Sequence, residues 1–242
     1  MRVERVVRQG EPEYPILFEL WDQAPTVLYC AGQVSLLNGT CIAVIGTREP
    51  TEAGKKTAFN LARALAAVPD VVILSGLAAG CDTQAHRGAL AAKGKTLAVF
   101  GTPLAEIYPP ENRDLAEQIV QSGGLVVSCY EKPARDKAER KRRFIERDQV
   151  QAALSMGVIP IQGNLTSGTR HAVEWAWEHD RVIAVPRPIA QDQVAYPDQY
   201  ALIEKYIKLG ASGAVQVIEG KASYPELLVS LGVKVREAGP VK

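Results

Sequence analysis

The sequence lacks any segment that would direct the chain to a membrane or through one. Its first residues, MRVERVVRQGEPEYP, are charged and contain no apolar core of the kind that a signal peptide needs. No apolar run approaches the length that is required to cross a bilayer. We therefore expect a cytoplasmic protein without a membrane partner.

The sequence also lacks an excess of charge of either sign. Its 28 Lys and Arg residues nearly balance its 27 Asp and Glu residues, which leaves a formal net charge of +1. A balanced chain has no overall field that would attract a polyanion. Any site for nucleic acid must therefore be a local patch on the surface.

Cysteine and histidine are scarce and show no metal-binding spacing. The cysteines are Cys30, Cys41, Cys81 and Cys129, and the histidines are His86, His171 and His179. Each cysteine lies in or beside an apolar run, as expected of small buried residues in a reducing compartment. We expect no disulfide, no metal site and no cofactor.

What the sequence does contain, from residue 41 onward, is an alternation of short apolar runs with helical patterns. The runs are apolar on both alternate faces, which is typical of strands buried on both sides of a parallel sheet. They cover 41–45, 71–74, 96–100, 125–129, 157–161 and 181–185. Between them lie helical patterns such as 51–68 and 168–180. The alternation predicts an α/β fold with a doubly wound, mainly parallel sheet and helices on both faces.

The two ends of the chain differ from this pattern. We expect residues 1–39 to form an irregular cap with a short helix, residues 40–215 the sheet domain, and residues 216–242 a short helix and a tail. Further helical patterns lie at 197–210, where a glycine would end the helix, and at 224–233. The last residues, REAGPVK, are expected to fray.

Small and polar residues follow three of the predicted strands, at the edge where a doubly wound sheet binds its ligands. They are Gly46, Thr47 and Arg48, then Ser75, Gly76 and Gly80, and then Ser167, Gly168, Thr169 and Arg170. Small residues let backbone N–H groups approach an anion, and a following helix N-terminus adds partial positive charge. Arginine can hold a phosphate through two donors. The loops therefore predict a phosphate site, without indicating which phosphate.

The standard cofactor and hydrolase signatures are missing. No G-x-G-x-x-G follows the first strand, and no acid follows the second strand to hold a ribose, which disfavours a dinucleotide. The AGKKT segment at 53–57 ends like a Walker A motif, but Gly46 lies too far before it. No G-x-S-x-G elbow is present. Asp82 and His86 lie one turn apart, so we expect them to fix the loop by a hydrogen bond rather than to react.

A basic stretch interrupts the pattern after the fourth strand. EKPARDKAERKRR, at 131–143, holds seven Lys or Arg residues against three acids. Such a stretch is typical of a solvated loop, and the alternative is one wall of a phosphate-binding face. Tyr108 and Tyr130 are candidates for stacking on nucleic-acid bases, although aromatic residues at such places usually pack.

Five motifs together resemble one family, the DNA-processing proteins of bacterial transformation called DprA or Smf. The stretch SGLAAGCDTQAHRGAL at 75–90 is similar to the family signature S-G-x-A-x-G-I-D-x-x-A-H-x-x-A-L. The other stretches are AVIGTREPTEAG, TLAVFGTPLAEIYPPENRDLAEQI, YPILFELWDQAPTVLYCAG and SGTRHAVEWAWEHDRVIAVP. The resemblance covers about residues 14–190.

The resemblance implies an extended Rossmann-like domain that binds single-stranded DNA, forms homodimers and helps to load a RecA-type recombinase. It implies a binding protein of DNA recombination rather than an enzyme. Carried over by position, the pocket for DNA phosphates would be lined by Gly46, Thr47 and Arg48, by Ser75, Gly76, Gly80 and Asp82, and by Ser167 and Gly168, whereas Arg170 departs from the family pattern. The chain looks like a divergent member that is limited to the Rossmann-like domain.

The resemblance weakens in the second half of the motif set. The family pattern F-P-x-R-N-R-x-I-A-G-L-S is matched by FIERDQVQAALS, which keeps Phe144 and Arg147. Asp148 replaces an asparagine and Gln149 an arginine, so positive charge is lost where Arg147 is expected to contact the strand. Gln162 replaces the family's glutamate at the end of the next strand.

Two alternatives stay open from the sequence. The first is a nucleotide-binding protein, or a phosphoribohydrolase that frees bases from nucleoside monophosphates. The motif of that enzyme class has its nearest match in TSGTRHAVE at 166–174, where Glu174 comes two positions late and Ala172 takes the acid's place. The second is a partner-binding protein, which an exposed apolar patch on the helix 197–210 would support.

Overall fold

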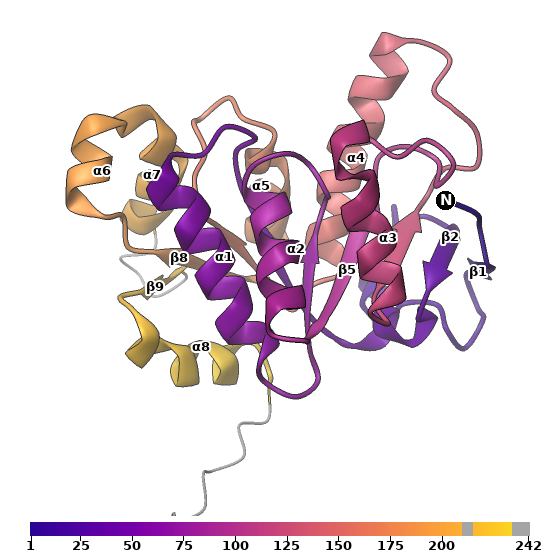
Figure 1. Cartoon of the computed structure of the whole chain (residues 1–242), viewed down its shortest axis with the longest axis horizontal. Coiled ribbons are helices and arrows are strands. Elements are labelled where there is room, and N and C mark those ends of the chain that lie inside the picture. Colours follow the sequence, from indigo (N-terminus) through magenta and orange to yellow (C-terminus); the bar gives the residue numbers. More distant parts are fainter. Residues whose placement is uncertain (210–214, 234–242) are drawn as a thin grey trace, which may run out of the picture.

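A sheet of nine strands forms the centre of the computed structural model, which describes residues 1–209 and 215–233. The strand order is β1-β2-β6-β5-β4-β3-β7-β8-β9. All neighbours from β6 to β9 in this order are parallel, whereas β1 and β2 join antiparallel at the β6 edge (Figure 1). The bounds are β1 Arg5–Arg8, β2 Val27–Gly32, β3 Thr40–Ile45, β4 Val71–Ser75, β5 Lys95–Phe100, β6 Leu125–Ser128, β7 Gly157–Pro160, β8 Val182–Pro186 and β9 Val215–Ile218.

The order in which the chain adds strands creates a crevice at one edge of the sheet. From β3 the chain adds β4, β5 and β6 on one side, and it then returns to place β7, β8 and β9 on the other. The strands β3 and β7 are neighbours, and the loops that follow them therefore lead away from each other. In open α/β sheets, ligands bind in the crevice at such a switch point, outside the carboxyl ends of the strands.

Helices cover both faces of the sheet. On one face lie α1 Glu52–Ala66, α2 Cys81–Ala91, α3 Arg113–Gln121 and α8 Tyr224–Ser230 (Figure 1). On the other face lie α4 Lys137–Ala153, α5 Thr169–Glu178 and α7 Ala201–Leu209. The short α6 Ala190–Ala195 and the 3-10 turns η1 Ile16–Leu20, η2 Val34–Asn38, η3 Pro110–Asn112, η4 Pro197–Tyr200 and η6 Lys221–Ser223 complete the described elements. Within the described ranges, no helix combines the length and apolar character that crossing a membrane requires.

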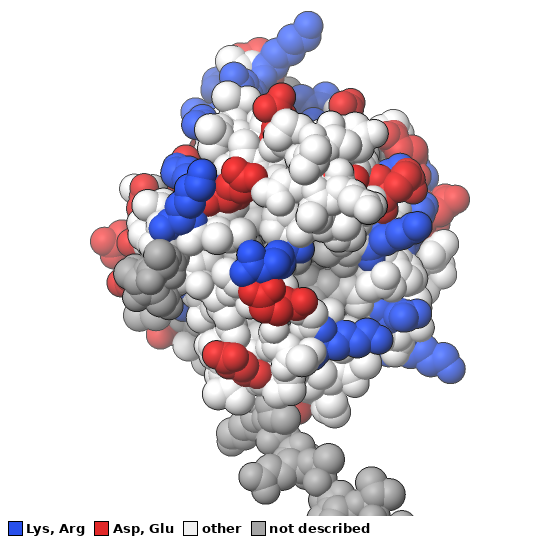
Figure 2. Space-filling view, turned by 90° about the vertical axis from the view of Figure 1, so that its left-hand side faces the viewer, with Lys and Arg blue, Asp and Glu red and all other residues white. Residues whose placement is uncertain are grey.

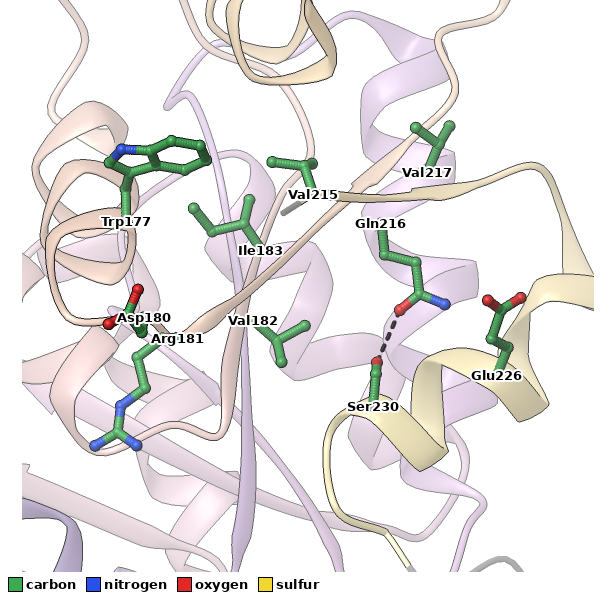
Figure 3. A pocket seen from close by; sticks show the side chains of 10 residues that line it. All are labelled: Trp177, Asp180, Arg181, Val182, Ile183, Val215, Gln216, Val217, Glu226 and Ser230. Carbon is green, nitrogen blue, oxygen red and sulfur yellow. Dashed lines mark hydrogen bonds between the residues drawn. The ribbon is translucent and has the colours of Figure 1, made fainter. Parts of the chain in front are cut away.

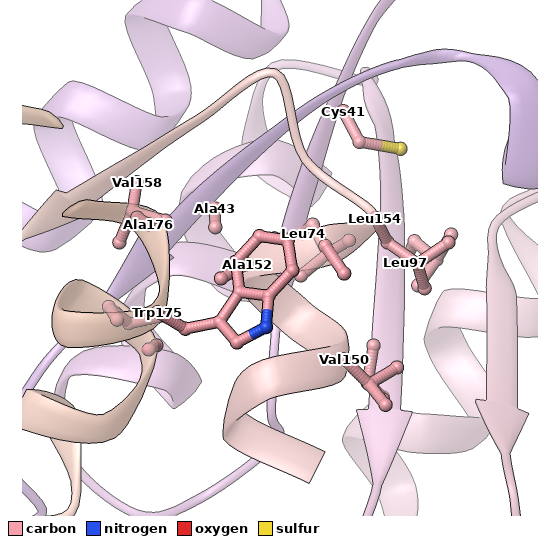
Figure 4. Packing of buried hydrophobic residues seen from close by; sticks show 14 of the residues in the cluster. Cys41, Ala43, Leu74, Leu97, Val150, Ala152, Leu154, Val158, Trp175 and Ala176 are labelled. Carbon is pink, nitrogen blue, oxygen red and sulfur yellow. The ribbon is translucent and has the colours of Figure 1, made fainter. Parts of the chain in front are cut away.

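The core on the α4–α5 face is built around one tryptophan. Trp175 of α5 is 4% exposed and packs among small and branched residues of α4 and the sheet (Figure 4). An aromatic series ties the N-terminal segment to it, because Trp21 meets Trp175 edge to face at 5.4 Å and Phe18 meets Trp21 at 5.9 Å. Residues 1–39 are thereby fixed to the core of the sheet domain.

The six predicted strands and the predicted fold class are confirmed. Strands β1, β2 and β9 were missed, because their side chains are only partly buried, which weakens the apolar pattern; β1 and β9 are the two edge strands, and β2 lies next to β1. The cap expected at 1–39 contains the strands β1 and β2 and the 3-10 turns η1 and η2. The division into units at 39/40 and 215/216 stays a prediction. The predicted helix end at residue 210 and the last residues expected to fray, 236–242, lie outside the described residues.

Helices α1 and α2 pack closely at one glycine, which gives a test of the fold. A Cβ added at Gly88 would lie 2.3 Å from the carbonyl oxygen of Phe59. Alanine normally favours a helix over glycine by about 1 kcal/mol, but the clash should outweigh this gain. We expect Gly88→Ala to destabilise the protein by roughly 1–3 kcal/mol in urea unfolding. The neighbouring exposed Arg87→Ala should have little effect, and equal stability of the two variants would contradict the helix packing.

Candidate functional site

A cavity of about 430 Å³ occupies the crevice at the switch point. Its wall combines the loop after β3, the start of α2, the middle of α4 and the loop between β7 and α5. The lining residues are Ile45, Gly46, Thr47, Arg48, Glu49, Ala78, Asp82, Arg147, Asp148, Gln151, Asn164, Ser167, Gly168, Thr169, Ala172 and Gln199. We call this space the crevice pocket.

The loop after β3 is clamped from two sides and presents Arg48 at its tip. The N–H of Thr47 donates to the carbonyl of Gln162 at 2.8 Å, and the carbonyl of Thr47 accepts from the N–H of Cys81 at 3.1 Å. Gly46 fits this clamp because a Cβ there would lie 2.6 Å from the sulfur of Cys81. Arg48 is exposed. The loop therefore holds one free guanidinium at the rim of a rigid pocket.

Gln162, which replaces the family's glutamate, is a structural residue beneath this loop. Its side chain is fully buried, and its Oε1 accepts from the N–H of Thr51, the N-cap of α1. Its Nε2 donates to Asp192 of α6, which also accepts the hydroxyls of Thr51 and Tyr200. This network fastens the segment from α6 to η4 onto the start of α1.

The loop after β4 borders the pocket, but its polar groups are bonded within the protein. The hydroxyl of the fully buried Ser75 donates to the carbonyl of Val44 at 2.7 Å. Asp82, in the first turn of α2, accepts the N–H groups of Gly76 at 3.1 Å and Ala78 at 3.3 Å. The loop predicted to cradle an anion is thus closed by its own carboxylate.

Gly80 ends this loop in a conformation that favours glycine. Its φ is +80°, and a Cβ there would lie 2.5 Å from the carbonyl oxygens of Thr47 and Arg48. This close approach brings α2 against the loop that carries Arg48.

The histidine of this helix is structural, as expected, but its predicted partner is wrong. His86 is fully buried, and its Nδ1 pairs with the hydroxyl of Thr96 at 2.8 Å instead of with Asp82. Burial, with the nearby charge of Arg147, lowers the pKa of His86 to about 3. The imidazole is therefore neutral at every physiological pH.

Arg147 is a buried cation that lies beneath the loop after β4. Its Nη1 donates to the carbonyl of Gly76 at 2.7 Å and lies 4.0 Å from a carboxylate oxygen of Asp82. Its Nε lies 3.1 Å from a carboxylate oxygen of Asp148. Gly76 fits because a Cβ there would overlap Nη1, at 1.5 Å. Since the guanidinium is already directed to protein acceptors, contact of Arg147 with phosphate stays a prediction that would require some of these bonds to be given up.

The start of α5 faces the crevice pocket with unpaired backbone donors. Gly168 is the N-cap of α5 and Thr169 its first residue, so their N–H groups have no acceptor within the helix. Gly168 is exposed, and Ser167 beside it donates its hydroxyl to the carbonyl of Asn164 at 2.8 Å. A helix N-terminus of this kind is suited to an anion.

Asp148 places a carboxylate opposite this helix N-terminus. Its Oδ2 lies 3.5 Å from the position that a Cβ would take at Gly168. Burial raises the pKa of Asp148 to about 7, with Asp82 adding to the rise while Arg147 and Arg48 oppose it. The replacement seen in the sequence therefore brings a titratable group into the wall of the pocket.

A second cavity of about 320 Å³ adjoins the first and is aromatic. The two cavities share Arg48, Glu49, Ala78 and Arg147 in their linings. Tyr108, which is 37% exposed, and Phe144 line the second cavity with ring centroids 5.6 Å apart. The guanidinium of Arg48 lies 5.7 Å from the Phe144 ring. We call this space the aromatic pocket.

The basic stretch becomes the start of α4 instead of a loop throughout. Asp136 caps the helix by accepting the N–H of Glu139 at 2.8 Å. Glu139 in turn accepts the backbone N–H and the guanidinium of Arg135 and the guanidinium of Arg143, which lowers its pKa to about 2. Two of the three acids of the stretch, Asp136 and Glu139, are thus engaged locally. In the described part of the chain, Lys132, Lys137 and Lys141 form no ion pair and are exposed.

Two aromatic residues lie under this basic helix. The guanidinium of Arg140 lies 4.4 Å from the ring of Tyr108, and that of Arg143 lies 4.4 Å from the ring of Tyr130. The hydroxyl of Tyr130 donates to Glu146 at 2.7 Å. Of the two tyrosines considered for base stacking, Tyr108 is the one that lines a pocket.

The structure brings most of the predicted loop residues to the crevice pocket. Gly46, Thr47, Arg48, Asp82, Arg147, Ser167, Gly168 and Thr169 line it, and Gly76 lines the aromatic pocket. Ser75, Gly80 and Arg170 line neither. No sequence pattern indicated Asn164 or Gln199, and the side chain of Gln199 donates to the carbonyl of Glu49 at 3.2 Å across 150 positions. Asp148 was visible as a departure from the family pattern.

A larger cavity of about 780 Å³ lies elsewhere, at the edge of the sheet. It is bordered by the end of α5 and by β8, β9 and α8, with Trp177 and Arg181 at one side (Figure 3). None of the predicted site residues lines it.

Comparison with known proteins identifies the family. The model of the family described as DNA recombination-mediator protein A matches residues 5–214. The chain belongs to this DprA family. The protein Smf of Synechocystis is 37% identical over 183 residues, which are 73% of this chain but 44% of the relative. The chain thus spans less than half the length of that curated relative.

Two solved DprA structures have the same fold. The DprA of Streptococcus pneumoniae superimposes with a TM-score of 0.78 at 28% identity, over 92% of this chain and 73% of that one. The DprA of Helicobacter pylori, whose structure concerns its single-stranded DNA binding mode, gives a TM-score of 0.76 at 29% identity, over 93% and 96%. The extended Rossmann-like fold implied by the motifs is therefore confirmed.

The two arginines of the crevice pocket should differ in their effect on stability. Arg147→Ala leaves two buried carboxylates without their shared cation, which we expect to cost about 3–5 kcal/mol. Arg48→Ala removes an exposed side chain and should change the free energy of unfolding by no more than about 0.5 kcal/mol. Urea unfolding at neutral pH measures both. A stable Arg147→Ala protein would show that the buried network does not support the loops.

Proposed function

We propose that the chain binds single-stranded DNA and acts, like its relatives, in the processing and protection of DNA strands during transformation and recombination. The observation that carries the proposal is the joining of two pockets at Arg48. One pocket offers backbone donors and a cation for a phosphate, and the other offers aromatic rings for a base. A nucleotide unit of a single strand needs both.

The phosphate would lie in the crevice pocket. The N–H groups of Gly168 and Thr169 at the start of α5 supply donors, and the exposed guanidinium of Arg48 supplies the charge. These groups come from the two loops that diverge at the switch point, where ligands of such sheets bind.

The base would lie in the aromatic pocket. Tyr108 and Phe144 present ring surfaces there, and every base has a face that can stack on them. Such stacking does not depend on the base sequence. The proposal therefore predicts binding with little base preference.

The strand would continue along the start of α4. The free Lys132, Lys137 and Lys141 lie on this helix and the loop before it. Figure 1 shows this end of α4 projecting beyond the sheet on the side of α3. A local cationic ridge can bind a polyanion even though the whole chain is nearly neutral.

A binding role accounts for the pocket better than catalysis does. In the phosphoribohydrolase alternative, the acid of the motif should face the ligand, but Ala172 lines the crevice pocket in its place and Glu174 does not line it. Asp148 has a pKa near neutrality, as a general acid needs, so nucleoside monophosphates are the substrates to test. Release of free base from nucleoside monophosphates would favour the phosphoribohydrolase alternative.

Homodimer formation and contact with a recombinase are further parts of the proposal. An exposed apolar patch on the helix 197–210 would have supported partner binding, but Leu202, Ile203 and Tyr206 of α7 are buried and only its last residue, Leu209, is among the exposed large apolar side chains. Three more exposed apolar side chains precede the helix, at Ile189, Val194 and Tyr196. Figure 2 shows an uncharged area on the side of the molecule where α6 and α7 lie.

Loss of Arg48 tests the phosphate site. We expect Arg48→Ala to weaken binding of a labelled dT oligonucleotide roughly ten- to a hundredfold at low salt, because a charge-assisted contact is lost. The slope of log K against log salt should fall by about one unit. Fluorescence anisotropy across a salt series measures both.

Arg63→Ala is the matched control for this experiment. Arg63 is also exposed and also lies over a phenylalanine, with its guanidinium 5.8 Å from the Phe59 ring, but it lies in the last turn of α1. The Arg63→Ala protein should bind the oligonucleotide like the unmodified protein. Equal loss in both variants would mean that only net charge matters, and no binding by the unmodified protein would reject the proposal.

Substitutions of Tyr108 test the base site. Tyr108→Leu keeps an apolar side chain but removes the ring, which should cost about 1–3 kcal/mol of binding. Tyr108→Phe keeps the ring and should bind normally. The same anisotropy titration distinguishes them. If the leucine variant binds as tightly as the phenylalanine variant, the base does not stack on this side chain.

A further inference from the structure

Asp148 poses a problem for an anion site, because its carboxylate is directed into the pocket where the phosphate is expected. One oxygen, Oδ1, is held by the Nε of Arg147 at 3.1 Å. The other, Oδ2, faces Gly168 at the N-terminus of α5. An ionised carboxylate at this place would lie beside the phosphate and repel it.

The charged groups around Asp148 favour protonation of one carboxylate in the pocket. Arg147 on α4 is the only buried cation among the described groups that face it, and it is shared with Asp82 of α2. From the loop after β3, Arg48 faces Asp148 across the pocket, and Glu49 lies exposed at the rim. Two buried carboxylates thus share one guanidinium, a situation that favours protonation of one of them.

Of the two carboxylates, Asp82 is the one suited to keep its charge. It accepts two backbone N–H groups and stands in the first turn of α2, where a negative charge is stabilised. In the described part of the chain no backbone N–H donates to Asp148, although its Oδ2 faces the N-terminus of α5. Burial raises the pKa of both carboxylates, that of Asp148 to about 7, so the two backbone hydrogen bonds of Asp82 decide the assignment.

We propose that Asp148 binds the DNA phosphate as a protonated acid, donating its hydroxyl to a phosphate oxygen, so that DNA binding takes up one proton above neutral pH. The carboxylate, one proton and the phosphate combine into a single hydrogen-bonded pair, and no other bond is made or broken. This inference rests on the proposed function, because it assigns a role within the same phosphate site.

The sign of the pH effect follows from this linkage. While Asp148 is protonated in the free protein, binding needs no further proton and the affinity is constant. Above the pKa of the free protein, each binding event must first add a proton, so the affinity falls by up to tenfold per pH unit. Burial and the charge of Arg170 lower the pKa of His171, which moves its titration away from this range.

The test is a titration of a labelled dT oligonucleotide at constant low salt, in EDTA, over a pH series. Between about pH 6.5 and about pH 8.5, we expect the unmodified protein to lose roughly twentyfold in affinity. Asp148→Asn offers a neutral N–H donor at every pH, so its affinity should be constant over the same range. Calorimetry at the upper pH in two buffers of different ionisation enthalpy should show about one proton taken up by the unmodified protein and none by the variant.

Glu49→Gln is the matched control. It removes an exposed carboxylate from the rim of the same pocket. It should strengthen binding at every pH and keep the pH dependence, since Glu49 is not the group that gains the proton.

The outcomes separate the inference from the proposed function. Equal pH dependence in Asp148→Asn and in the unmodified protein overturns the inference and leaves DNA binding intact. Binding that appears only when Mg²⁺ replaces EDTA also overturns it, because the carboxylate would then hold a cation instead of a proton. Absence of binding in all variants rejects the proposed function, and the inference with it.

Discussion

The buried guanidinium of Arg147 is the interaction on which the rest of the site depends. From α4 it reaches the carbonyl of Gly76 after β4 and lies between the carboxylates of Asp82 and Asp148. One cation thereby fixes α4, the loop after β4 and the start of α2 relative to one another. A buried charge of this kind adds little net stability, but its removal is costly, so it enforces one arrangement of the loops.

The buried network around Arg147 holds the loops in place, which explains why few groups are needed to bind a ligand. Asp82 closes the loop after β4, and Gly80 lets α2 approach the loop that carries Arg48. With these loops held in place, Arg48 is fixed between the crevice pocket and the aromatic pocket. A preorganised site loses less entropy on binding than a mobile one, so a single exposed arginine beside a helix N-terminus is sufficient to define it.

The sequence predicted the fold well because the central strands are apolar on both faces, and the loops after β3 and β7 because they are small and polar. It could not predict the inward turn of Ser75 or the burial of Arg147, since side-chain direction depends on packing between distant elements. His86 illustrates the same limit: the spacing to Asp82 suggested a partner, but Thr96 of the adjacent strand lies closer. The outer strands β1, β2 and β9 were not predicted because partial exposure weakens their apolar pattern.

A nearly neutral chain can contain a site for a polyanion because its charges are unevenly distributed over the molecule. On α4 the acids Asp136 and Glu139 are used in helix capping and in pairs with Arg135 and Arg143, which leaves the neighbouring lysines free for a ligand. In the crevice pocket the opposite holds, since the acids there outnumber the cations unless one of them is protonated. Binding in the pocket is therefore governed by proton occupancy, whereas binding along α4 is governed by salt, and the two parts of one site respond to different conditions.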